Sequence, residues 1–157
     1  MQRPSPTPAA TAAAANTKGA PAKGALSAQD NQFASEAAKG GMMEVAGGKA
    51  AAKNAKSADV KQFGNRMVSD HSKANNELKA IIAKKGLKLP GASGAPKWSG
   101  DKAYMDMMVQ DHEKDLAEFK TEASKGSDPD LKAFASRTEK VIADHLKMAK
   151  KIDGTLK

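Results

Sequence analysis

The chain has 157 residues, of which 39% are hydrophobic and 4% aromatic, with no Cys and a formal net charge of +8. These values exclude a disulfide framework, thiolate metal sites and thiol catalysis. They also disfavour an all-β fold, because the β-branched and aromatic residues that cover a sheet are scarce. No apolar run approaches the roughly 20 residues needed to cross a bilayer, so no transmembrane span is expected.

Residues 1–26 are predicted to form a disordered tail before a single helical domain at 27–157. Pro, Ala, Thr and Gly dominate the tail, which offers too little apolar surface to offset the entropy lost on ordering. No apolar stretch follows Met1, so the tail is not expected to be a secretion signal, although it is compatible with a signal removed from in front of it.

Basic and acidic residues are mixed along the helical domain. The tail carries three basic residues and no acid, which leaves +5 (8 − 3) for residues 27–157. Lys alternates there with Asp and Glu, as on a solvated helix surface. A nucleic-acid-binding domain is expected to gather basic residues on one face and to present aromatic side chains for stacking. No specific nucleic-acid partner is therefore predicted.

Four amphipathic helices are predicted from apolar residues that recur at spacings of three and four. Ser57 is a good N-cap residue for the second helix, and Asp128-Pro129 provides an N-cap followed by proline at the first position of the fourth. Gly86 and Gly126 are suitable helix ends. The predicted helices cover about 27–56, 57–86, 101–126 and 128–153.

The connections between these helices indicate their arrangement. Short connections join the first helix to the second and the third to the fourth, so each pair is expected to be antiparallel. The segment at 86–100 is longer, and at about 3.3 Å per residue it can run the length of a helix of about 27 residues. We therefore predict an all-α, ferritin-like antiparallel four-helix bundle with a long connection between its second and third helices. A simple up-and-down bundle is the alternative.

All three histidines follow an aspartate, in the pairs Asp70-His71, Asp111-His112 and Asp144-His145. Each His lies within an apolar stripe of its helix, which predicts an inward-facing ring. His71 and His112 lie near the midpoints of their helices, and His145 lies about one turn beyond its midpoint. The three rings are therefore predicted to lie within one or two helical turns, of about 5.4 Å each, of one another.

Glu44, near the midpoint of the first helix, is the predicted carboxylate of the same layer. Two apolar stripes compete on this helix. One includes Phe33, Glu44 and Ala51, whereas the other includes Ala34 and Val45 and turns Glu44 aside. The first stripe is preferred because it buries the aromatic ring of Phe33.

Three imidazoles and one carboxylate at one level suit a transition-metal ion such as Zn, Cu or Fe. The predicted ligands are Glu44, His71, His112 and His145. Each Asp lies about 100° around its helix from the adjacent His, so it is expected to accept an N–H bond from a ring rather than to bind the ion. The predicted partners of the ligands are Asp70, Asp111, Asp144 and Tyr104. The alternative is a metal-free layer in which the buried rings only form hydrogen bonds.

Methionine gives a second form of the metal hypothesis. Thioether and imidazole together suit Cu(I), and the candidate soft ligands are Met67, Met105 and Met108. All three lie on core stripes, so packing beside the Gly- and Ala-rich first helix is the simpler interpretation. A di-iron carboxylate centre is not expected, because no Glu-x-x-His pair occurs in the chain.

Three segments are distinctive: GGMMEVAGGKAAAKNAKSADVKQFGNRMVSDHSKANNEL, DKAYMDMMVQDHEKDLAEF and DPDLKAFASRTEKVIADHLKMAKKI. Their motifs are an Asp-His after Arg-Met-Val, a second Asp-His after Tyr-Met, and a final His in the fourth helix. Over residues 29–153 the chain resembles a bacterial family filed as a domain of unknown function (DUF, number four-one-four-two). The resemblance implies a ferritin-like bundle and export to the periplasm or outer membrane, but no particular activity. It places recurrent polar positions of the family at Glu44, Asp70, His71, His112 and His145.

The sequence therefore predicts an exported four-helix-bundle protein that binds one transition-metal ion, for sequestration, storage or stress protection, and takes no organic cofactor. The alternative is a non-catalytic, metal-free structural or envelope-stress protein. No nucleophile elbow, phosphate-binding loop or dinucleotide fingerprint occurs, so an enzymatic role is disfavoured. Association with the cell envelope is expected from the family resemblance alone.

Overall fold

The computed structural model describes residues 25–92 and 94–157, which form four α-helices without a strand. Each helix begins and ends within two residues of its predicted bounds. Most of the predicted tail lies outside the described residues, although Leu26 packs against the hydrophobic core. The helices are α1 (Ala28–Asn54), α2 (Ala58–Lys84), α3 (Asp101–Lys125) and α4 (Pro129–Asp153).

Polar side chains begin three of the helices. Ser27 accepts a hydrogen bond from the backbone N–H of Asp30 at the start of α1, and Ser57 does the same for Val60 in α2. Asp128 accepts from two backbone N–H groups in the first turn of α4. These bonds satisfy donors that have no partner within the helix, which explains why the predicted boundaries agree with the structure.

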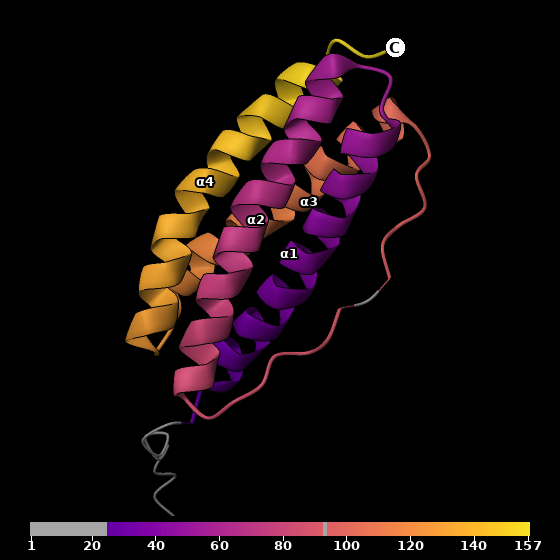
Figure 1. Cartoon of the computed structure of the whole chain (residues 1–157). Coiled ribbons are helices and arrows are strands. Elements are labelled where there is room, and N and C mark those ends of the chain that lie inside the picture. The colour runs from indigo at the N-terminus through magenta and orange to yellow at the C-terminus, as the bar shows by residue number, and fades with distance from the viewer. Residues whose placement is uncertain (1–24, 93) are drawn as a thin grey trace, which may run out of the picture.

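The helices are arranged as two antiparallel hairpins, α1–α2 and α3–α4 (Figure 1). The hairpins contact each other mainly through α2 with α4 and α1 with α3. Residues 85–92 and 94–100 run along the bundle beside α1, from the end of α2 to the opposite end, where α3 begins (Figure 1). The long connection makes α2 and α3 run in the same direction. The predicted crossover topology is confirmed, and the simple up-and-down alternative is wrong.

Two hydrophobic clusters fill the bundle, one toward each end. The first is centred on Phe33, Phe119 and Phe134, whose ring centroids lie 4.9–6.4 Å apart. The second is rich in methionine and surrounds Phe63. On every helix, one buried Glu or His near mid-length separates the residues of the first cluster from those of the second. A polar layer thus crosses the bundle between two apolar regions.

Both candidate stripes of α1 are buried. Glu44 is 3% exposed, as the preferred stripe requires, and Phe33 of the same stripe packs against Phe119 of α3. The competing stripe, which contains Ala34 and Val45, also includes Gly41 and Gly48, and these two glycines face α2. The two stripes are therefore not alternatives, because α1 packs against a different neighbour on each.

Backbone atoms of α1 and α2 approach closely at Gly48 and Gly64. A Cβ on Gly64 would lie 2.7 Å from the carbonyl oxygen of Gly48 and 2.8 Å from the Cβ of Ala51. Gly64→Ala should therefore lower the free energy of unfolding by about 1–3 kcal/mol, although Ala favours a helix by about 1 kcal/mol over Gly. Urea denaturation measures this difference.

The matched control is Gly40→Ala, in the same hairpin. The nearest neighbouring atom to a Cβ at Gly40 is Asp115 Oδ2, at 4.0 Å. This substitution should leave stability unchanged or raise it by up to about 1 kcal/mol. If both variants unfolded at the same urea concentration, the close approach of α1 and α2 would not be the reason for glycine at position 64.

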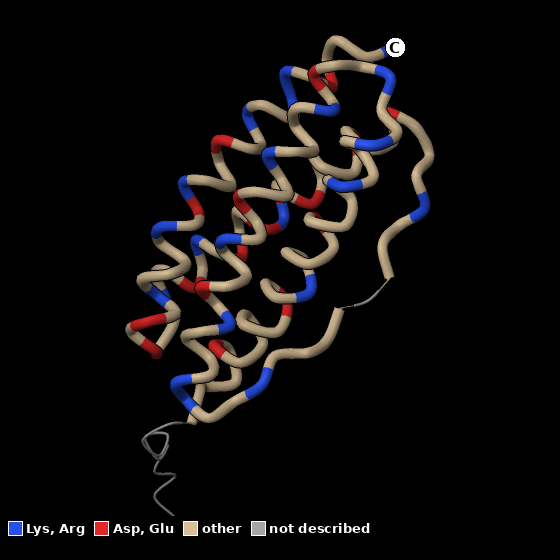
Figure 2. The backbone as a smooth tube through the Cα atoms, in the orientation of Figure 1, with Lys and Arg blue, Asp and Glu red and all other residues tan. Residues whose placement is uncertain are grey.

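The surface of the bundle carries both signs of charge. Basic and acidic residues are distributed over all four helices (Figure 2). Within residues 25–92 and 94–157, no helix combines the length and the apolar character that crossing a bilayer requires.

Candidate metal centre

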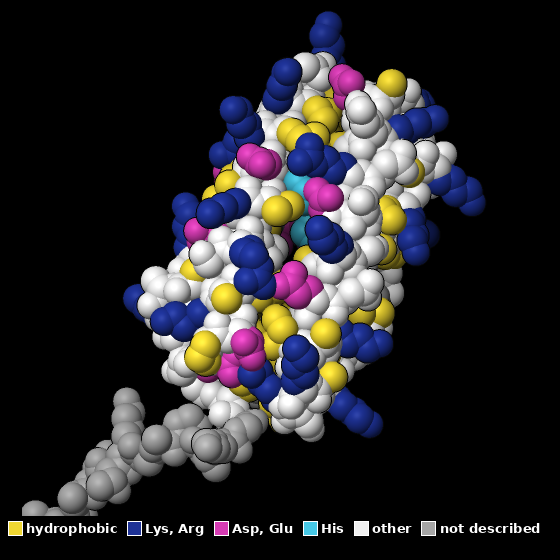
Figure 3. Space-filling model, turned by 60° about the vertical axis from the view of Figure 1, so that its left-hand side comes forward, with side chains coloured by type: hydrophobic (Ala, Val, Ile, Leu, Met, Phe, Trp, Pro, Cys, Tyr) yellow, Lys and Arg dark blue, Asp and Glu magenta, His cyan; other side chains and the backbone are white. Residues whose placement is uncertain are grey.

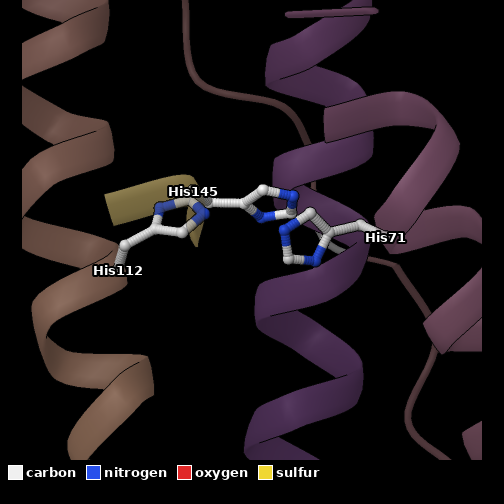
Figure 4. A group of neighbouring side chains, drawn as sticks. All are labelled: His71, His112 and His145. Carbon is white, nitrogen blue, oxygen red and sulfur yellow. The ribbon is translucent and has the colours of Figure 1, made fainter. Parts of the chain in front are cut away.

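The polar layer receives one side chain from each helix. Glu44 comes from α1, His71 from α2, His112 from α3 and His145 from α4, and all four are at most 6% exposed. The three imidazole rings lie together between the helices (Figure 4), with centroids 5.2–5.7 Å apart. One ligand nitrogen of each ring lies within 4.8 Å of the other two. The predicted convergence of the three rings is confirmed.

One nitrogen of each ring is bonded to an oxygen of the protein. Carbonyl and carboxylate oxygens accept hydrogen bonds, so the bonded nitrogen carries the proton and donates it. This fixes the tautomer and the orientation of each ring. The three bonds run from His71 Nδ1 to Glu44 Oε2 at 2.9 Å, from His112 Nδ1 to the Met108 carbonyl at 2.8 Å, and from His145 Nε2 to Asp70 Oδ2 at 2.8 Å.

The other nitrogen of each ring is buried and has no hydrogen-bond partner among the described residues. These atoms are His71 Nε2, His112 Nε2 and His145 Nδ1. In a neutral ring whose first nitrogen donates, the second nitrogen carries a lone pair. Leaving such an acceptor buried and unpaired costs about 1–3 kcal/mol. A single cation among the rings would satisfy all three lone pairs at once.

Glu44 contributes a fourth unpartnered atom to the layer. Its Oε2 bonds to His71, whereas its Oε1 has no hydrogen-bond partner and lies 3.4 Å from His112 Nε2. Two ligands that each lie about 2.0 Å from a tetrahedral metal are about 3.3 Å apart. The Glu44 carboxylate therefore holds the ring of His71 through Oε2. Its Oε1 lies as far from His112 Nε2 as two ligands of one tetrahedral metal lie from each other.

Burial and charge set the protonation of the layer. Burial lowers the pKa of His112, and it lowers the pKa of His145 to about 4 although the bond to Asp70 opposes the shift. Burial also acts to lower the pKa of His71, but attraction and a hydrogen bond to Glu44, together with the charges of Asp115 and Asp70, outweigh it, and the net shift is upward. Burial acts to raise the pKa of Glu44, but the bond to His71 and attraction to the three histidines together outweigh it, so the net shift is downward. At neutral pH the layer therefore holds two neutral rings and one ring paired with a carboxylate.

The three Asp-His pairs differ in the structure. Asp70 accepts hydrogen bonds from His145 and Arg66. Asp111 is half-buried and Asp144 is exposed, and within the described residues neither bonds to a histidine. Of the three predicted aspartates, only Asp70 meets a ring, because α2 packs directly against α4 and brings its carboxylate opposite His145.

The other predicted partners lie in the methionine-rich cluster. Tyr104 packs against Phe63 and Trp98, and its buried hydroxyl has no partner, so the structure does not bring it to a ring. Burial raises the pKa of this hydroxyl. The candidate soft ligands are fully buried in the same cluster, and the hydrogen bond from His112 goes to a methionine carbonyl rather than to a sulfur. Those candidates are Met67, Met105 and Met108.

Asp115 is a carboxyl group near the layer that the sequence analysis missed. The pKa of Asp115 is raised to about 8, mainly by burial and in addition by the negative charges of Glu44 and Glu118. It is therefore mainly protonated and neutral at neutral pH. Asp115 follows His112 by three residues, and that spacing places two side chains on one helix face. The spacing of three between His112 and Asp115 is the signal in the sequence that indicates this position.

Several solved structures share the fold. A conserved hypothetical protein from Mycobacterium tuberculosis aligns with a TM-score of 0.71 and 13% identity, over 82% of this chain and 93% of that chain. A DUF305 fragment from Deinococcus radiodurans gives 0.71 and 10%, over 83% and 99% of the two chains. A two-domain protein from Anabaena variabilis, with DJ-1/ThiJ/PfpI-like and ferritin-like domains, gives 0.65 and 11%, over 83% of this chain and 38% of that chain. These likenesses establish the fold alone, and the predicted ferritin-like bundle is confirmed.

The family of the chain follows from its sequence. No curated protein matches it. The model of the family described as "Domain of unknown function (DUF4142)" matches residues 15–152. The match includes all four helices nearly to the end of α4, and with them the complete polar layer. The chain therefore belongs to the DUF4142 family, as the resemblance of its Asp-His motifs implied.

Proposed function

We propose that this protein binds one transition-metal ion in the polar layer, through His71, His112 and His145, with Glu44 balancing the charge. Two observations on the same three rings carry the proposal: each ring brings one ligand nitrogen within 4.8 Å of the other two, and each ring keeps one buried nitrogen without a hydrogen-bond partner. The other nitrogen of each ring donates to an oxygen. Metal-ligating histidines are usually held in this way, since the second bond fixes the tautomer and makes the ligand nitrogen more basic.

The dimensions of the layer suit such an ion. Nitrogens at most 4.8 Å apart lie at most about 2.8 Å from a common centre, so shifts of under about 1 Å give the zinc–nitrogen distance of about 2.0–2.1 Å. Neutral imidazole with one carboxylate suits Zn, Cu and Fe. Because the layer lies between two hydrophobic clusters, its electrostatic interactions are less screened than they would be at the surface.

The proposed role is sequestration, storage or protection against metal stress rather than catalysis. The family resemblance implies export, so we place this role in the periplasm or at the outer membrane. The rival proposal is a metal-free structural or envelope-stress protein. One observation favours it: every ring already has one hydrogen bond within the protein, so the layer is partly satisfied without an ion.

Metal analysis of the full chain without a His-tag separates the two proposals. The protein is dialysed against Zn, Cu, Fe or Ni, freed of unbound ion, and analysed by mass spectrometry for metal per chain. We expect one tightly held ion per chain for at least one of these metals. Protein that retains none of the four would contradict metal binding and support the structural role.

Asp70→Ala should weaken metal binding by about 10–100-fold, whereas Asp144→Ala should leave it unchanged. Asp70 accepts the N–H bond of His145 and so fixes the nitrogen that faces the layer. Removing such a supporting bond typically costs 10–100-fold in affinity. Asp144 is exposed and bonds to no ring. Competition with a chromophoric chelator measures both affinities. Equal losses of affinity in the two variants would show that the bond between Asp70 and His145 does not support metal binding.

A further inference from the structure

A pocket of about 410 Å³ opens between α2 and α4 and reaches the polar layer. We call it the α2–α4 pocket, and its lining includes Asp70, His71, Ala74, Val141, Asp144 and His145. Seen from outside, histidine side chains are visible near the middle of the molecule, between acidic and basic residues (Figure 3). The pocket between α1 and α3, which includes Thr121 and Glu122, has no histidine in its lining. The layer is thus reached from outside between α2 and α4.

The rim of the α2–α4 pocket carries charges of both signs. Arg66 pairs with Asp70 at 3.3 Å, and Arg137 pairs with Glu77 across the two helices. Lys73 and Asp144 add one further charge of each sign. The rim is therefore close to neutral and opposes the entry of neither ion type. A cation at the base of the pocket would make its net charge positive, and the pocket would then attract anions.

The protein ligands leave the pocket side of the layer free. The lining of the α2–α4 pocket contains no residue of α1 or α3. Glu44 and His112, which come from those two helices, therefore approach the layer from its other side, while His71 and His145 form part of the pocket wall. In the proposed site the three rings are the protein ligands, and Glu44 balances the charge through its bond to His71. Metal sites with three protein ligands keep a position for water or another small ligand, whereas closed structural zinc sites have four protein ligands.

We propose that a metal ion held by the three rings keeps one exchangeable coordination position, and that this position faces the α2–α4 pocket and takes a small anion. The chemical class is a compact monoanion with an oxygen or nitrogen donor, such as a short carboxylate or hydroxide. The positive charge of the ion favours a negative ligand, because the charges on the rim of the pocket nearly cancel one another. This inference rests on the proposed function, because the anion binds to the metal rather than to the protein alone.

The test uses Cu(II) as the metal and azide as the anion. The full chain is loaded with one equivalent of Cu(II) and titrated with azide, whose bond to copper gives a charge-transfer absorption. Val141→Trp should obstruct the pocket, because Val141 lines it and precedes His145 by four residues on the same helix face. At 38% exposure, Val141 can be enlarged without disturbing the core.

We expect saturable azide binding to the wild-type protein and an azide dissociation constant raised by about tenfold or more in Val141→Trp. Copper affinity should stay within about threefold of the wild-type value, and Val141→Phe should give a smaller effect in the same direction. The matched control is Met43→Trp, because Met43 is similarly exposed, at 36%, but lies on α1 outside the pocket lining. This variant should bind azide like the wild-type protein.

The outcomes separate this inference from the function on which it rests. Protein that binds no Cu(II), nor any other metal, refutes the proposed function and the inference with it. Copper-loaded protein without an azide absorption refutes the open position but leaves metal binding intact. Equal azide affinities in Val141→Trp and Met43→Trp would show that azide does not reach the copper through the α2–α4 pocket.

Discussion

Replacing His112 with alanine should weaken metal binding by more than about 100-fold, since the loss of a supporting bond alone costs 10–100-fold. The ring of His112 is fully buried and faces His71 and His145, and its Nε2 has no other partner. The two remaining rings already supply one ligand each, so the substitution leaves the ion with one nitrogen ligand fewer. Competition with a chromophoric chelator at pH 7.5 measures the affinity.

The control for this substitution is Tyr104→Phe. Tyr104 lies on the same helix and is buried, but its hydroxyl bonds to no ring. The variant should retain the wild-type affinity. His112 also packs against Phe63, with centroids 6.3 Å apart, so the alanine variant is compared below its own melting temperature, determined by circular dichroism. A folded His112→Ala protein with wild-type affinity would exclude this ring as a ligand.

Metal affinity should fall by about tenfold for each pH unit just below the pKa of His71, and more steeply once the other two rings also take up protons. Attraction to Glu44 raises the pKa of His71, and the bond at Nδ1 leaves Nε2 as the atom that takes up the second proton. A metal must displace that proton. Burial lowers the pKa of His145 to about 4 and also lowers that of His112, so proton competition begins at a higher pH at His71 than at these two rings.

The sign of this effect follows from the raised pKa. Protons compete at His71 below its pKa and not above it, so affinity is constant at alkaline pH and is lost on acidification. Glu44→Gln removes the charge that raises the pKa, so the dependence should begin at a lower pH, and affinity at pH 7.5 should be weaker because charge balance is lost. Chelator competition from pH 5 to 8 measures both curves. A wild-type affinity that did not change between pH 5 and 7.5 would contradict the pairing of His71 with Glu44.

Much of the fold was predictable because its determinants are local. Apolar residues at spacings of three and four define each helix, and Ser57 and Asp128 begin two of them through hydrogen bonds within one turn. The long connection was sufficient to allow a crossover, but its length alone did not require one. The choice between the two topologies depended on how α2 and α4 pack, which is not encoded in either helix by itself.

The convergence of the histidines was also predictable. Helical periodicity gives the side of the helix on which a ring lies, and the position of the residue along its helix gives the level of the ring in the bundle. The supporting contacts were not. Asp70, Asp111 and Asp144 occupy the same position relative to their histidines, yet only Asp70 faces a ring on a packed neighbour. Periodicity fixes the angle between two side chains on one helix, whereas a bond between helices also depends on which neighbour lies at that angle.

The pairing of helices gives the metal site a consequence for the lifetime of the protein. Each hairpin is closed by a short turn, but the contacts between hairpins depend on side-chain packing along α2–α4 and α1–α3. The three rings come from both hairpins, His71 from one and His112 and His145 from the other. A bound ion would therefore act as a cross-link between the hairpins and slow their separation. Resistance to proteases would then report the metal status of the compartment in which the protein resides.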